Sequence, residues 1–165
     1  MKPAPDVARV SQLVNGALDD LLRPYGIAPQ WVAADEAIPG SYWGETEAGL
    51  IGDRLILRPD TPVHSALHEA CHFICLQNRD AHILKTCASP LFVHTDAGGS
   101  DLEECAVCYL QCLLADRLRG YSRERMFADM DAWGYSFRLG AARDWFQRDA
   151  DDARAWLVQR ALLPA

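Results

Sequence analysis

The chain has 165 residues, half of them hydrophobic and 24% charged, which predicts one packed globular domain over residues 1–165, because two domains would each be near the lower size limit. The formal net charge of −7 argues against a nucleic-acid partner, which requires a basic face. The apolar stretches fall far short of the ~18 residues that span a bilayer, and no apolar run follows Lys2, so we expect a cytoplasmic protein with no membrane partner.

The first elements in chain order are a helix and a small sheet. Apolar residues recur at helical spacing over 6–23, where Pro24 ends the predicted helix. From 29 to 60, short apolar pieces alternate with glycine-containing turns, which predicts a small antiparallel meander of about three strands. Pro59 and Pro62 end this sheet.

The remainder of the chain reads as mostly helical. A helix is predicted over 62–78, then a segment at 79–99 that is mostly loop. Ser100 and Glu103 form a capping-box pattern that opens a long helix to about Arg119. Three further helical stretches are expected, one beginning at Ser122 and two over roughly 138–147 and 150–162. The order of helix, small sheet and helices predicts an α+β fold.

Six cysteines are expected to stay reduced, because the chain is large enough to fold without disulfides and has no export signal. Their helical spacing favours packing in the core as small apolar side chains. The alternative is a thiolate metal site, but a single CxxC pair lacks the partner pair that would complete four ligands. The cysteines are Cys71, Cys75, Cys87, Cys105, Cys108 and Cys112.

Residues 68–72 read His-Glu-Ala-Cys-His, an H-E-x-x-H sequence. Residues four apart share one face of a helix, so His68 and His72 can bind one Zn²⁺ together. Glu69 lies one step around the helix, where it can take a proton from the zinc-bound water as a general base. Short matches of this kind arise by chance, but two histidines and a glutamate on an apolar helix require something that satisfies them. The motif therefore predicts a metal site.

A catalytic zinc needs a third protein ligand, for which five residues are candidates. His64 is eight residues from the second histidine of the motif, about 12 Å along a helix, so one ion cannot bridge them. His82 does not fit the extended H-E-x-x-H-x-x-G-x-x-H spacing, and His94 in the predicted loop stays open. Glu103 and Glu104 at the start of the next helix are the favoured pair.

Glu103 is preferred over Glu104 because it begins an E-x-x-A sequence whose Ala106 lets this helix approach the first one closely. The capping-box pattern points the other way, since it would hold Glu103 at the helix end and leave Glu104 available. A structural reading, in which both are acids placed favourably in the first turn of a helix, is the remaining alternative.

These residues resemble the Glu-zincin metallopeptidases and, within them, the ImmA/IrrE-like family. In that family a strand and an H-E-x-x-H helix precede a helix of the form E-x-x-A-x-x-F-A-x-x-L-L, and residues 103–114 follow this register. The resemblance implies a zincin-like fold with His68, His72 and Glu103 as zinc ligands and Glu69 as the catalytic base. The Asn or Asp that often follows the alanine in the family is Val107 here, which predicts the loss of a hydrogen bond that orients a ligating histidine.

The expected function is a zinc-dependent hydrolase, a metallopeptidase that cleaves a peptide or protein substrate. The alternatives are a regulatory or protein-binding module on a zincin scaffold without turnover, and a hydrolase of a non-peptide amide. The sequence does not name the substrate, the oligomeric state or the donor that holds the developing oxyanion, for which His82, His94, Tyr109 and Tyr121 are candidates.

Overall fold

The computed structural model describes residues 5–41, 46–78 and 101–164, and these residues form a mixed α+β structure, as predicted. The elements are η1 (Val10–Gln12), α1 (Ala17–Leu22), η2 (Arg23–Tyr25), β1 (Ala28–Trp31), β2 (Gly49–Ile51), β3 (Arg54–Leu57), α2 (Val63–Asn78), α3 (Asp101–Ala115), α4 (Arg123–Trp133), α5 (Ala142–Arg148) and α6 (Asp151–Gln159). The two labelled η are short 3₁₀ helices.

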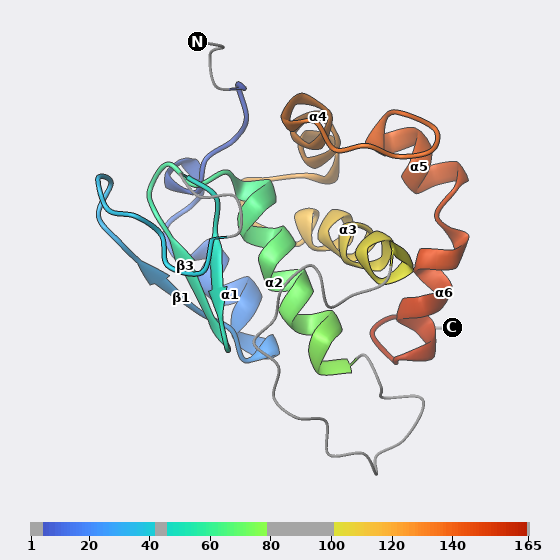
Figure 1. The fold of residues 1–165 in the computed structure, drawn as a ribbon, viewed down its shortest axis with the longest axis horizontal. Coiled ribbons are helices and arrows are strands. Elements are labelled where there is room, and N and C mark those ends of the chain that lie inside the picture. The colour runs from blue at the N-terminus through green and yellow to red at the C-terminus, as the bar shows by residue number, and fades with distance from the viewer. Residues whose placement is uncertain (1–4, 42–45, 79–100, 165) are drawn as a thin grey trace.

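Helix α2 lies at the centre of the molecule. It packs against β2 and β3 on one side and against α3 on the other, as Figure 1 shows. Its apolar residues Val63, Ala66, Leu67 and Ala70 are fully buried, so the helix forms because both of its sides have a partner. The prediction of a helix over 62–78 is confirmed, and its motif is held in the interior.

The sheet is mixed, so the prediction of an antiparallel meander was wrong in one respect. Strands β2 and β3 form an antiparallel hairpin whose turn begins at Gly52 with a φ of +61°, a value that a type II′ turn requires at this position. Strand β1 pairs with β3 in parallel, with Ala28 opposite Arg54, and the strand order is β1-β3-β2. Strands β1 and β2 therefore lie on opposite edges of the sheet and are not paired with each other.

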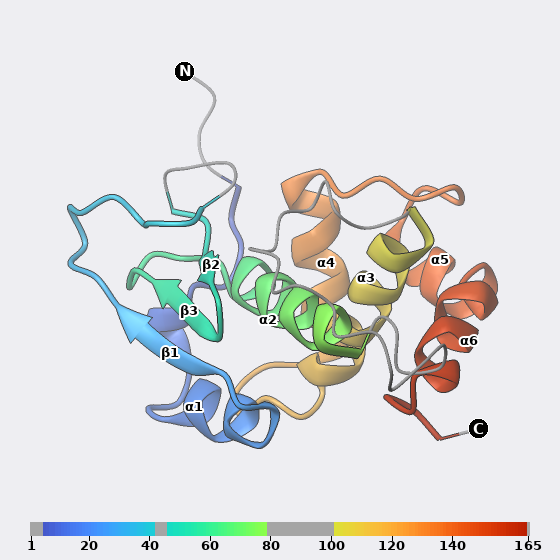
Figure 2. The same ribbon diagram turned by 60° about the horizontal axis from the view of Figure 1, so that its bottom comes forward.

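The predicted helix over 6–23 is shorter than expected. The residues before α1 lie along the segment that precedes α2, where the backbone N–H of Val10 donates to Thr61 O at 2.8 Å and that of Ser11 to Pro59 O at 3.1 Å. These bonds take donors that a helix would use internally, and Gly16 with a φ of +79° separates this part from α1. Figure 2 shows α1 beside β1.

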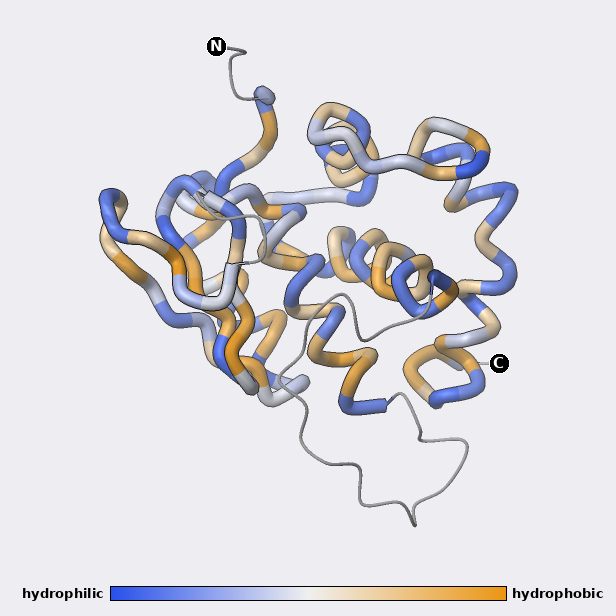
Figure 3. The backbone as a smooth tube through the Cα atoms, viewed as in Figure 1, coloured by the Kyte–Doolittle hydropathy of each residue, from blue (hydrophilic) through white to orange (hydrophobic). Residues whose placement is uncertain are grey.

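The C-terminal helices cover α3. Helix α3 contacts α4 and α6, and Ser122 caps α4 by accepting a hydrogen bond from the Arg125 N–H at 3.1 Å. Along these helices orange and blue positions alternate in Figure 3, as expected where one face is buried. Helix α3 ends at Ala115, before the predicted Arg119, while the predicted helices near 138–147 and 150–162 correspond to α5 and α6.

Two sequence expectations lie wholly or partly outside the described residues: the loop at 79–99, and the capping box, whose Ser100 is among the residues not described. In the part of the chain that is described, no helix has both the length and the apolar character needed to cross a membrane.

Candidate metal centre

Helix α2 places the two histidines of the motif one turn apart on the same face. The ring centroids of His68 and His72 are 4.6 Å apart, and their Nε2 atoms approach to 3.0 Å. His72 is buried and the His68 side chain is 14% exposed. The two imidazoles therefore direct the same ring nitrogen to one point, as the spacing of the motif predicts.

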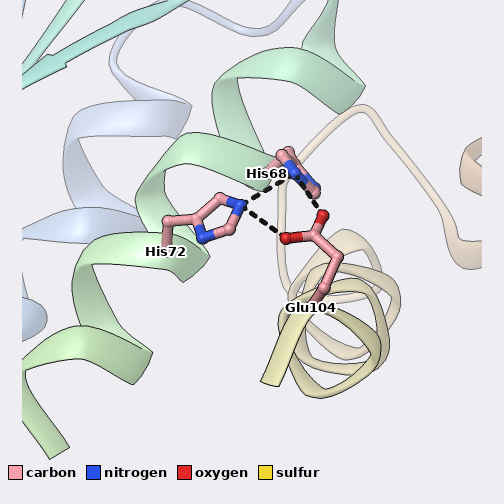
Figure 4. Close-up of side chains that lie close together, drawn as sticks. All are labelled: His68, His72 and Glu104. Atoms are coloured by element: carbon pink, nitrogen blue, oxygen red, sulfur yellow. Dashed lines mark hydrogen bonds and ion pairs between the residues drawn. The ribbon is translucent and has the colours of Figure 1, made fainter. Parts of the chain in front are cut away.

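Glu104 of α3 brings a carboxylate to that point, as Figure 4 shows. Its Oε1 lies 3.0 Å from His68 Nε2 and its Oε2 lies 3.1 Å from His72 Nε2. Two ligands at 2.0–2.1 Å from one tetrahedral ion are about 3.3 Å apart, close to these separations. Among the described residues, His68, His72 and Glu104 are the group whose donor atoms could hold a metal ion.

The structure brings Glu104 to the histidines. Glu103, which the sequence favoured as the third ligand, does not join them, and its alternative Glu104 does. Consecutive helical residues point about 100° apart, so only one of the two acids can face α2. Glu103 is buried, with 5% of its surface exposed, and lies outside the group that could hold an ion. Ala106 is fully buried on α3.

The three side chains form a strong electrostatic cluster. Burial would lower the pKa of His68, but hydrogen bonds to Cys108 and to the Glu104 carboxylate outweigh it and raise this pKa well above its usual value. Burial would likewise raise the pKa of Glu104, but the hydrogen bonds from His68 and His72 hold it at about 2. The carboxylate is therefore ionised at neutral pH and ready to face a cation.

Gln111, which sequence reasoning gave no role, supplies the hydrogen bond that was expected to be missing at Val107. Its Oε1 lies 2.9 Å from His68 Nδ1, and its Nε2 donates to the backbone oxygen of His64 at 3.0 Å. Gln111 is fully buried. It follows Glu104 by seven residues, so both lie on the α3 face that meets α2. A polar residue at this interval within an apolar helix was the signal that could have identified it.

A cavity of about 370 Å³ opens beside the cluster. Its wall includes His68 and Glu104, together with Glu69 from the next position of α2. Trp133 also lines the cavity, and its indole N–H donates to Glu47 Oε1 at 2.9 Å. The predicted base Glu69, the predicted ligand His68 and Glu104 thus border one space that a ligand can enter.

His64 lies next to the centre without joining it. Its side chain is buried, it lines the same cavity, and its Nδ1 is 3.1 Å from the Tyr135 hydroxyl. Burial, helped by the charges of His68 and Arg9, lowers the pKa of His64 to about 3, so its ring is neutral. His64 thus lies beside the group that could hold an ion and is not part of it.

The other candidates named from sequence are elsewhere or not described. Tyr109 stacks on Phe146 with ring centroids 4.5 Å apart, and the Tyr121 hydroxyl donates to Asp129 at 2.7 Å, so neither hydroxyl lines the cavity. His82 and His94 lie outside the described residues.

The cysteines in the described part of the chain are free thiols. Cys71, Cys75, Cys108 and Cys112 are buried between α2 and α3 or beside them, and Cys105 is half-buried, as the core-packing interpretation predicted. Burial raises the pKa of Cys108 to about 11, which keeps it protonated. Cys87 lies outside the described residues.

Comparison with known proteins does not assign this chain to a family. The functional inference therefore depends on the motif and on the convergence of its side chains with Glu104. Neither the family models nor the curated proteins nor the solved structures give a match to this chain.

Proposed function

We propose that this protein is a zinc-dependent hydrolase of the zincin-like type, a metallopeptidase that acts on a peptide or protein substrate. The observation that carries the proposal is the convergence of His68 Nε2, His72 Nε2 and the Glu104 carboxylate on one point beside a cavity that Glu69 also lines. The order of strand, H-E-x-x-H helix and acid-bearing helix supports the same assignment.

The donor set fits zinc. Two imidazole nitrogens and one carboxylate are the ligands of a catalytic zinc that keeps one position open. Hard ions such as Mg²⁺ prefer oxygen ligands, so the two imidazoles select against them. When bound, zinc would lower the pKa of a coordinated water and polarise the carbonyl of the scissile bond.

Glu69 is the general base in this proposal. It precedes His72 by three positions on α2 and borders the cavity, so its carboxylate can accept the proton of the attacking water. The same carboxyl group then returns that proton to the leaving amine. Glu104 and the two imidazoles would hold the ion, and the cavity of about 370 Å³ would accommodate the part of the substrate next to the cleaved bond.

Metal content of matched variants tests the ligand set. Purified wild-type protein should hold one zinc per chain. His68→Ala and Glu104→Gln should lose most of it, while Glu103→Gln should retain it, because only Glu104 faces the histidines. The adjacent glutamine variants are controls for each other. Equal zinc content in both would reject Glu104 as a ligand, and absence of zinc from the wild-type protein would reject the metal centre.

Glu69→Gln tests the reaction separately from the site. This variant should bind zinc as the wild type does and lose hydrolysis of a peptide library by roughly 10²–10⁴-fold, the contribution typical of general base catalysis. Undiminished turnover would reject Glu69 as the base. A wild-type protein that binds zinc and cleaves no peptide or amide would favour the alternative of a regulatory or protein-binding module.

A further inference from the structure

Four side chains form a continuous hydrogen-bonded chain beneath the metal centre. His68 Nδ1 is 2.9 Å from Gln111 Oε1, and Gln111 Nε2 is 3.4 Å from the Tyr135 hydroxyl. That hydroxyl is in turn 3.1 Å from His64 Nδ1. The chain runs on the side of His68 that faces away from Glu104, so none of its bonds competes with the metal position.

The backbone determines the orientation of the Gln111 amide. Its Nε2 lies 3.0 Å from the carbonyl oxygen of His64, and a carbonyl oxygen accepts but cannot donate. The amide nitrogen must therefore face His64, which leaves Oε1 facing His68. Since Oε1 only accepts, the proton between these two side chains belongs to His68 Nδ1.

Tyr135 links Gln111 to the second histidine, His64. The Gln111 amide nitrogen can only donate, so the Tyr135 oxygen accepts from it, and the hydroxyl proton is available for His64 Nδ1 at 3.1 Å, the direction that we infer for this bond. Burial raises the pKa of Tyr135 well above its usual value, so the hydroxyl keeps this proton. The neutral His64 ring then carries its proton on Nε2, the atom for which the described residues offer no hydrogen-bond partner.

We propose that Gln111 is a positioning residue of the metal centre that fixes the ring protons of two histidines on different nitrogen atoms. It holds the proton of His68 on Nδ1, which leaves the Nε2 lone pair for the ion, and through Tyr135 it holds the proton of His64 on Nε2. The first part rests on the proposed zinc site, whereas the second holds with or without metal.

Positioning of this kind changes metal binding, because a ligating histidine whose second nitrogen donates to a fixed acceptor is oriented before the ion arrives. It also leaves the buried His64 Nε2–H without a hydrogen-bond partner among the described residues, in a side chain that lines the cavity.

Two-bond ¹H–¹⁵N correlation spectra of the histidine rings test the proton positions directly, in the full chain at pH 7.5. In the zinc-loaded wild type, His68 should show a protonated Nδ1 and a metal-bound Nε2. In both zinc-loaded and zinc-free protein, His64 should show a single tautomer with the proton on Nε2. Single histidine variants assign the signals. A His64 proton found on Nδ1 would overturn the proposal.

Zinc affinity of two variants, measured by chelator competition, tests the positioning role. Gln111→Met keeps the side-chain volume and removes both hydrogen-bonding functions, so zinc should bind roughly 10–100-fold more weakly. Tyr135→Phe removes only the hydroxyl, so zinc affinity should stay within about threefold of wild type while His64 loses its single tautomer.

Leu114→Ala is the control for general destabilisation, because Leu114 is buried on the same helix and lines no part of the cavity. It should leave zinc affinity unchanged. An equal loss of affinity in Leu114→Ala and Gln111→Met, or no loss in Gln111→Met, would overturn the positioning role. Should the wild type bind no zinc, the proposed function fails, and the His64 tautomer in metal-free protein still decides the second part.

Discussion

At the scale of single residues, hydrogen bonds between the two imidazoles and Glu104 occupy the position where a metal ion would bind. Without metal, the Glu104 carboxylate binds both imidazoles through hydrogen bonds, and the pKa of His68 is raised well above its usual value. A cation that takes this position must displace the proton on His68 Nε2. Because the pKa of Glu104 is about 2, its carboxylate contributes no proton at neutral pH. Metal binding and proton release are thus linked.

The first prediction follows from the sign of this exchange. At lower pH a proton competes more strongly with zinc for His68 Nε2, while Glu104 stays ionised. Zinc affinity should therefore fall as pH falls, by about tenfold per pH unit between pH 7.5 and 6 if one proton is released. Competition with a chromophoric chelator measures the affinity. Calorimetry in two buffers of different ionisation enthalpy counts the protons, and an affinity independent of pH over this range would contradict the expected exchange.

At the scale of secondary structure, helices α2 and α3 carry all three side chains of the candidate metal centre. Both helices were predicted from their sequences. The i, i+4 spacing required the two histidines to share a face of α2, and the 103–104 pair was the favoured source of a third ligand. What the sequence left open was the rotation of α3. The E-x-x-A sequence favoured a rotation that presents Glu103, and the capping pattern favoured one that presents Glu104. In the structure the face that carries Glu104 and Gln111 meets the histidines of α2.

The sheet and the N-terminal segment were predicted less well for a related reason. The apolar pieces over 29–60 identify strands but not their partners, and β1 pairs in parallel with β3, which is not the next strand in the chain. Helical spacing over 6–23 was also insufficient, because the N–H of Val10 bonds to Thr61 rather than within a helix. Long-range pairing overrides local pattern in both places.

A buried carboxylate attaches this N-terminal segment to α4, and the second prediction concerns it. Asp129 is 1% exposed and accepts hydrogen bonds from the Ala8 N–H at 3.2 Å, the Tyr121 hydroxyl at 2.7 Å and Arg125 Nε at 2.8 Å. Asp129→Ala leaves two of these donors buried without an acceptor, so the free energy of unfolding should fall by about 3 kcal/mol.

Chemical denaturation measures this loss, and Tyr121→Phe is the matched comparison. The phenylalanine variant removes one donor and leaves Asp129 bound to Ala8 and Arg125, so it should lose only about 1 kcal/mol. Equal losses for the two variants would mean that the carboxylate does not hold the N-terminal segment.

At the scale of the whole molecule, the candidate centre joins parts of the chain that are distant in sequence. The histidines belong to α2 and Glu104 to α3, and residues 79–100 separate the two helices in the chain. Helix α2 contacts the sheet while α3 contacts α4 and α6, so the ligands connect the two halves of the fold that Figure 1 shows. An ion bound there would stabilise the native arrangement of both halves, because the unfolded chain does not hold the three ligands together.

The third prediction is therefore a stability that depends on metal. Zinc at one hundred times its dissociation constant should add about 2.7 kcal/mol to the free energy of unfolding, which for a chain of this length raises Tm by roughly 5–10 °C. A chelator should reverse the shift. Glu104→Gln should show almost none of it and Glu103→Gln all of it, since only the first removes a donor from the cluster. A shift of equal size in both variants would mean that zinc stabilises the protein from another site, because binding at the cluster requires the carboxylate of Glu104.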